Sequence, residues 1–125
     1  MGGLRQSSKV NSNLGQLHLV SGTVSVTSGA WTITSNDPTV TGSDSGTAGN
    51  YVVTFGEEFL TVPHVFVAPF KVTHEATVFY NVMVESKTTT TAEFQVHHDT
   101  AGTNTTADPD DGDGFDFFAI GLRNN

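Results

Sequence analysis

The sequence predicts an all-β fold, a single antiparallel β-sandwich of about six to eight short strands with an extended N-terminal arm. Apolar and polar residues alternate at period two in several segments, and β-branched and aromatic residues dominate those segments. Segments rich in Gly, Ser, Thr, Asn and Asp separate them, whereas good helix formers are scarce and no helical period is found. A chain of 125 residues is long enough for one domain with its own core.

The elements follow from this alternation taken in order. Strands are expected at 17–27, 30–35, 50–55, 64–70, 77–86, 92–96 and 115–122. Turn-rich loops are expected at 36–49 and 99–114, and Phe59 is expected to enter the core from the turn between the two central strands. The residues expected to form the core between the sheets are Val65, Val67, Phe94, Val96, Phe117 and Ala119, with Trp31 closing one end.

The chain divides into a basic arm, residues 1–16, and an acidic sandwich domain, residues 17–125. The arm has no apolar period and carries Arg5 and Lys9 without any acidic residue, a net charge of +2. The domain holds three basic residues and all 13 acidic residues, a net charge of −10. The arm, residues 1–16, has two interpretations: a leader without a partner, or a segment that becomes ordered on a neighbouring subunit. The second reading makes Arg5 and Lys9 interface residues.

The strand expected at 77–86 carries large apolar groups on both faces. Its valines and Tyr80 share one face, while Phe79 and Met83 share the other. Unpartnered apolar groups of this size are uncommon on a monomer. Phe79 and Met83 are therefore expected at an interface between subunits, in a homotrimer.

Composition excludes several classes of function. The chain has no cysteine, so a disulfide framework, a thiolate metal site and a cysteine nucleophile are ruled out. A net charge of −8 argues against binding to nucleic acid, which needs clustered basic residues. No signal peptide and no membrane-spanning segment are expected, because no sufficiently long apolar stretch occurs.

One cluster has the composition of a cation site. Five carboxylates fall within the segment DPDDGDGFD: Asp108, Asp110, Asp111, Asp113 and Asp116. Calcium takes several hard oxygen ligands from one flexible loop, although the spacing of an EF-hand is not met. Two readings stay open, a calcium site and a solvated acidic turn. No other cofactor is expected. No catalytic residues are identified either, because no serine, histidine and carboxylate pattern of a hydrolase is found.

Four segments carry a resemblance to known families. They are GxYxVTF at 49–55, FxxxPxVxVxP at 59–69, TxxxFxV at 90–96 and FxFxAIGxR at 115–123. This pattern resembles phage virion proteins and bacterial surface proteins, and it is similar to the H-type lectin fold, a small antiparallel sandwich that trimerises. H-type lectins bind sugars of the N-acetylgalactosamine type at seams between subunits.

The resemblance implies a non-enzymatic structural protein of a virion. Within that class, the expected role is a capsid decoration (cement) protein or a small fibre or tail component, attached to other virion proteins through the N-terminal arm. The alternative is a glycan-binding module of the H-type lectin kind that recognises a surface glycan. Retention on a sugar column as a purified trimer would separate the second from the first.

Overall fold

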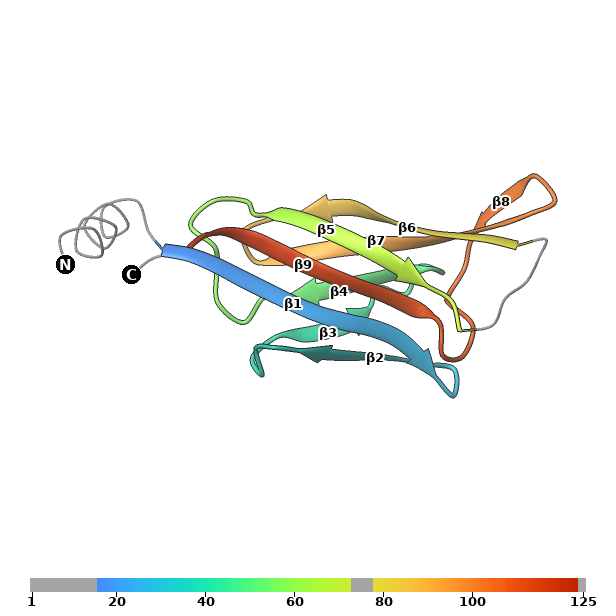
Figure 1. The fold of residues 1–125 in the computed structure, drawn as a ribbon, viewed down its shortest axis with the longest axis horizontal. Helices are drawn as coiled ribbons and strands as arrows, with labels where there is room; N and C mark the ends of the chain where they lie inside the picture. The colour runs from blue at the N-terminus through green and yellow to red at the C-terminus, as the bar shows by residue number, and fades with distance from the viewer. Residues whose placement is uncertain (1–15, 73–77, 124–125) are drawn as a thin grey trace.

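The computed structural model describes residues 16–72 and 78–123, which form nine β-strands and no helix. The strands build two antiparallel sheets that pack face to face, with sheet A in front of sheet B in Figure 1. Sheet A has the order β2 (Ala30–Ser35), β1 (Gln16–Thr27), β9 (Gly114–Arg123), β5 (His64–Phe70). Sheet B has the order β3 (Thr41–Asp44), β4 (Asn50–Thr54), β7 (Thr91–Thr100), β6 (Val78–Lys87), and β8 (Thr103–Thr106) also pairs with β7. The predicted antiparallel sandwich is confirmed.

Two of the nine strands lie where the sequence predicts turn-rich loops. β3 falls within 36–49 and pairs with β4, and β8 falls within 99–114 and pairs with β7. Neither strand contains a large apolar residue, so neither produces the alternation that reveals a half-buried strand. Their place in the sheet depends on backbone pairing alone. The loop prediction was wrong over these two stretches of four residues each.

The core lies between the sheets and is built from the inward residues of each alternating strand. Phe94 of β7 is fully buried, and its ring centroid lies 4.8 Å from that of Phe115 and 5.6 Å from that of Phe117. The expected core residues Phe94, Val96, Phe117 and Ala119 are all buried. Val65 and Val67 are half-buried and pack against this cluster. The predicted core is thus confirmed at its centre and is more open along β5.

Two aromatic residues close the core as the sequence predicts. Phe59 is 1% exposed and meets the ring of Phe55 edge-on at 5.1 Å. Trp31 of β2 is half-buried and stacks on Tyr51 of β4 at 4.8 Å, which ties the edge of sheet A to sheet B. The first strand also includes Gln16, whose side-chain oxygen accepts a hydrogen bond from Arg123. Sheet A therefore begins one residue before the expected boundary of the sandwich domain.

Candidate interaction surface

The outer face of sheet A is apolar over half its length. In β1, Val20 and Val24 point into the core, so Leu17 and Leu19 point outward. In β9, Phe117 and Ala119 are buried, so Phe118 is on the outside. The same rule places alternate residues of β5 on this outer face.

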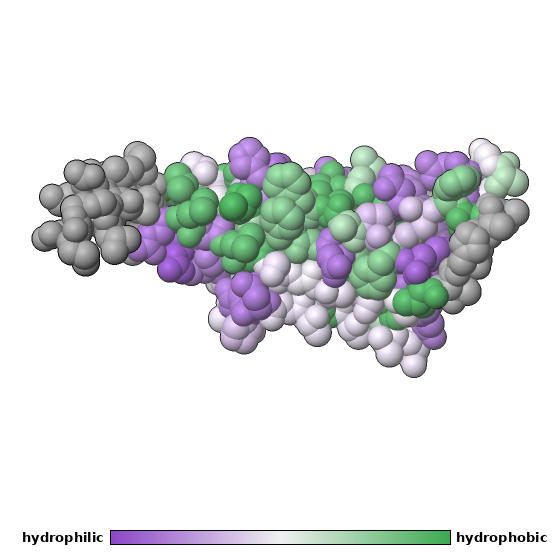
Figure 2. Space-filling view, viewed as in Figure 1, coloured by the Kyte–Doolittle hydropathy of each residue, from purple (hydrophilic) through white to green (hydrophobic). Residues whose placement is uncertain are grey.

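The strand register brings these outward residues together. Leu17 lies opposite Leu122, Leu19 opposite Ile120, and Phe118 opposite Phe66 of β5. We call this set of six residues the sheet A patch: Leu17, Leu19, Phe66, Phe118, Ile120 and Leu122. It contains no charged residue, and Figure 2 shows the continuous hydrophobic area that covers β1, β9 and β5.

Several patch residues are strongly exposed. Leu17 is 68% exposed, Leu19 50%, Phe66 51% and Phe118 41%. Leu60, which is 42% exposed, extends the apolar area, because its backbone N–H donates to the carbonyl of Leu122 at 2.7 Å. Soluble monomers rarely expose a contiguous apolar area of this kind, whereas protein interfaces and ligand grooves are built from such areas.

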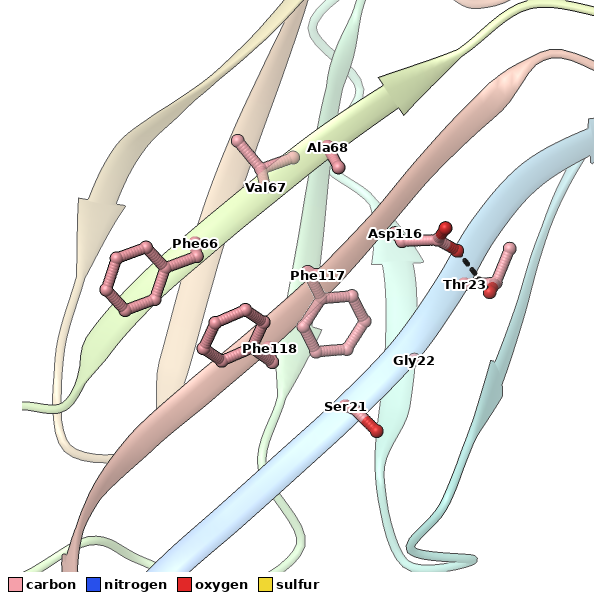
Figure 3. A pocket seen from close by; sticks show the side chains of 9 residues that line it. All are labelled: Ser21, Gly22, Thr23, Phe66, Val67, Ala68, Asp116, Phe117 and Phe118. Carbon is pink, nitrogen blue, oxygen red and sulfur yellow. Dashed lines mark hydrogen bonds between the residues drawn. The ribbon is translucent and has the colours of Figure 1, made fainter.

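A hollow of about 390 Å³ lies at one end of the patch (Figure 3). Phe66 and Phe118 form one wall, with ring centroids 4.7 Å apart and an angle of 22° between the rings. On the other side, the Thr23 hydroxyl donates a hydrogen bond of 2.6 Å to Asp116 Oδ1. The hollow therefore has an aromatic wall and a carboxylate facing it from a neighbouring part of the same sheet.

Small residues create this hollow. Ser21, Gly22 and Ala68 lie among the large side chains that surround it. A Cβ atom at Gly22 would lie 2.5 Å from the carbonyl oxygen of Thr34 and 2.8 Å from the ring of Phe117, so a larger residue does not fit there. Gly22 therefore lets β1 pack closely over the buried Phe117, while the small Ser21 and Ala68 leave the space on the outer face.

The hollow suits a ligand that has both an apolar surface and a polar or cationic group. Asp116 Oδ1 accepts from Thr23, and no ion pair of Asp116 is found within residues 16–72 and 78–123. A carboxylate in this state accepts further hydrogen bonds from a cation or from hydroxyl groups. The two phenyl rings offer a surface for stacking or for a cation.

A second apolar surface lies on the outer face of sheet B. Phe79 and Met83 of β6 point away from the core as the sequence predicts, with exposures of 76% and 47%. They line a shallow hollow of about 280 Å³ together with Asn81, His97, Asp99 and Asn104. In the single chain, one face of β6 packs against the core and the other face is exposed to solvent.

The five aspartates of the candidate calcium site make separate contacts, apart from Asp110 and Asp113, which both lie near Lys71. The carboxylate of Asp108 accepts from the N–H of Gly49, and that of Asp111 accepts from the N–H of Gly29, both at 2.8 Å. Asp116 binds Thr23, and Asp110 lies 3.8 Å from the Lys71 ammonium. In the part of the chain that the structure describes, no group of three or more His, Cys, Asp or Glu residues is placed to hold a metal ion.

Asp113 has a structural position instead. It is 1% exposed, and its carboxylate accepts from Lys71 Nζ at 2.9 Å and from the N–H of Val72 at 2.8 Å. Its own N–H donates to the carbonyl of Asp110 at 2.9 Å. These bonds tie the end of β5 to the start of β9, so Asp113 is part of the fold.

One pair of carboxylates lies on the outer face of sheet B. The side-chain amide of Asn50 donates to Glu85 at 2.5 Å and to Glu93 at 2.7 Å, and Gln95 donates to the oxygen of Asn50 at 3.1 Å. His97 Nε2 in turn lies 2.7 Å from the side-chain oxygen of Gln95. Both carboxylates are thus bound to a buried amide, which is an arrangement that stabilises the sheet.

The sequence located one of the two apolar surfaces. Phe79 and Met83 stand on one strand, so local alternation was sufficient to find them. The sheet A patch depends on three strands that are distant in the sequence, and only their pairing shows that the outward residues adjoin. The predicted interface residues Arg5 and Lys9 lie outside the described residues.

Comparisons with protein families, with curated proteins and with solved structures give no match for this chain. Within the described residues, the structure contains no helix with the length and apolar character needed to cross a membrane.

Proposed function

We propose that this protein is a non-enzymatic structural component of a virion, a capsid decoration (cement) protein or a small fibre or tail component, which assembles as a homotrimer. The observation that carries the proposal is the sheet A patch, an uncharged apolar area on a chain of net charge −8. An area of this kind binds other protein surfaces, because its burial removes apolar groups from water.

The remaining features support the same class. A small sandwich with an exposed apolar surface on the outer face of each of its two sheets has room to bind neighbouring proteins, its own copies included, on both sides. A basic N-terminal segment adds a third means of attachment. The assignment to a virion is supported by the four sequence segments that resemble phage virion proteins.

A glycan-binding module is the second candidate, and the hollow favours it. A sugar presents an apolar face, which stacks on aromatic rings, and hydroxyl groups, which donate hydrogen bonds to a carboxylate. Phe66, Phe118 and Asp116 offer these two kinds of contact within one hollow.

Two measurements separate the two candidates. One is co-sedimentation with shells that lack this protein, and the other is retention on an N-acetylgalactosamine column. For a structural protein we expect binding to shells, no retention by sugar, and loss of shell binding in Phe118→Asp. Thr103→Asp is the matched control, because it adds the same charge on exposed β8 of the other sheet. Sugar retention that is lost in Asp116→Asn, without binding to shells, would instead establish the glycan-binding module.

A further inference from the structure

The hollow has the chemistry of a receptor for a basic side chain. A guanidinium or ammonium group binds well over an aromatic ring and pairs with a carboxylate. Phe66 and Phe118 supply the rings, and Asp116 supplies the carboxylate, one oxygen of which is bound by Thr23. The volume of about 390 Å³ accommodates one long side chain.

The sheet A patch beside the hollow determines which residues can flank the basic residue in the segment that binds. It is uncharged, and it extends along β1 from Leu17 to the level of Ser21, which lies opposite Phe118, roughly 13 Å at the rise of a strand. A segment that fills both features needs a basic residue with apolar neighbours and no acidic residue. An acidic segment would be repelled by Asp116 and by the net charge of the body.

Residues 1–15 of this chain have that composition. They contain Arg5 beside Leu4, Lys9 beside Val10, and a further apolar residue, Leu14, without any acid. The other three basic residues of the chain are already engaged: Lys71 with Asp113, Lys87 with the carbonyl of Pro63, and Arg123 with Glu57. We propose that the sheet A patch binds residues 1–15 of a second copy, with Arg5 or Lys9 in the hollow beside Asp116.

A second copy is preferred over the same copy because of where β1 begins. Gln16 is at the end of sheet A, opposite Arg123, and Leu17 is already in the patch. A chain that continues the line of β1 leaves its own sheet at this end, so it reaches its own hollow only after a reversal. About ten residues separate Arg5 from Gln16, a reach of roughly 35 Å when extended, which suffices to cross the patch of a neighbour. The inference rests on the proposed assembly function and names one of its contacts.

The absence of cysteine allows a direct test by disulfide linkage in the full-length protein. One variant carries Gln6→Cys, next to Arg5, and the other carries Ser21→Cys, in the lining of the hollow. After the two are mixed and oxidised, we expect a covalent heterodimer. Thr103→Cys, exposed on β8, replaces Ser21→Cys in the matched control and is expected to give little product.

The charge pairing is tested in the same assay. Asp116→Asn keeps the oxygen that accepts from Thr23 but removes the charge, and we expect it to lower the yield of heterodimer about tenfold, as for loss of one charge-assisted contact. Linkage found only within a chain that carries both Gln6→Cys and Ser21→Cys would overturn docking on a second copy. Equal linkage to Ser21→Cys and Thr103→Cys would overturn the site. Either result leaves shell binding, and therefore the proposed function, to be judged by co-sedimentation.

Discussion

Asp113 is close in sequence to four other aspartates, yet its carboxylate is buried and paired in the folded protein. The five carboxylates are close in sequence, but the fold gives three of them separate hydrogen-bond donors and places Asp110 and Asp113 near the same cation, Lys71. Asp113 alone is fully buried, and a lysine and a backbone N–H satisfy its oxygens. A buried charge held in this way is sensitive to the loss of its partners.

We therefore expect Asp113→Ala to lower the free energy of unfolding by about 3–5 kcal/mol, because it removes a buried carboxylate that pairs with Lys71 at 2.9 Å and accepts from the N–H of Val72. Asp111→Ala is the control. Asp111 is exposed and makes one hydrogen bond to the N–H of Gly29, so its loss is expected to cost about 1 kcal/mol. Urea denaturation of both variants measures the difference, and equal costs would show that Asp113 does not stabilise the junction of β5 and β9.

Tyr80 gives a prediction about alkaline pH. Its hydroxyl donates to the carbonyl of Gly114 at 3.0 Å, and burial, with Asp113 and Asp110 nearby, raises its pKa above the usual value near 10. A pKa that is higher in the folded state gives a contribution to stability that is complete below pH 10 and is lost as the pH rises further.

Tyr80→Phe is expected to cost about 1 kcal/mol at pH 7, through the lost hydrogen bond. The same variant is expected to lose less stability than the wild type between pH 10 and pH 11, because one group with a raised pKa has been removed. Thermal denaturation across this range measures both effects. Parallel pH profiles would show that Tyr80 does not contribute to alkaline unfolding; Tyr51, whose pKa is also raised by burial and by Asp44, is then the group to examine.

At the level of the strands, period-two alternation decides which side chains are inside. Phe94 and Phe66 are the same residue type on strands of the two sheets, yet Phe94 is fully buried and Phe66 is 51% exposed. Phe94→Ala is expected to lower the free energy of unfolding by about 3–5 kcal/mol, the cost of a cavity among aromatic rings.

Phe66→Ala is the matched control and is expected to cost about 1 kcal/mol or less, because the ring is half-exposed, stacks on Phe118 at the surface, and leaves no closed cavity when it is removed. Chemical denaturation of the pair gives the two values. A small cost at Phe94 would place that ring outside the core and would contradict the face assigned to β7.

The same alternation explains how far the sequence determined the structure. It was sufficient for the strands that bury one face, such as β7, and for the exposed position of Phe79. It was insufficient for β3 and β8, which have no apolar side to bury. The sheet A patch was missed for another reason. Leu19, Ile120 and Phe66 are far apart in the chain, and their adjacency follows from long-range pairing with β9, which no local pattern encodes.

For the whole molecule, the two apolar surfaces lie on opposite outer faces of the sandwich, because one belongs to sheet A and the other to sheet B. The outer face of β6 is the surface expected to join the copies of a trimer. Phe79→Asp places a charge on this face without disturbing the core, since Phe79 is 76% exposed. We expect light scattering at micromolar concentration to show a mass below that of the trimer for this variant.

Thr34→Asp is the control for that variant, because it adds the same charge at an exposed position of β2, in the other sheet, and removes no apolar group. It is expected to keep the trimer mass. A wild-type protein that is a monomer at this concentration, or a Phe79→Asp variant of unchanged mass, would contradict a trimer held through β6.

The last prediction concerns residues 1–15 and the attachment of the whole assembly. Every residue of the core cluster lies at Val20 or beyond, so deletion of residues 1–15 is expected to leave the sandwich folded, with an unchanged melting temperature. Attachment is expected to be lost, because the arms link neighbouring copies, and copies linked in this way bind a repetitive surface through several weak contacts at once, with a gain of about 10²–10⁴. Co-sedimentation of deleted and full-length protein with undecorated shells measures this. A protein in which a Gly-Ser segment of equal length replaces residues 1–15 separates loss of the contacts from loss of length, and equal binding by all three proteins would mean that the body docks without its arm.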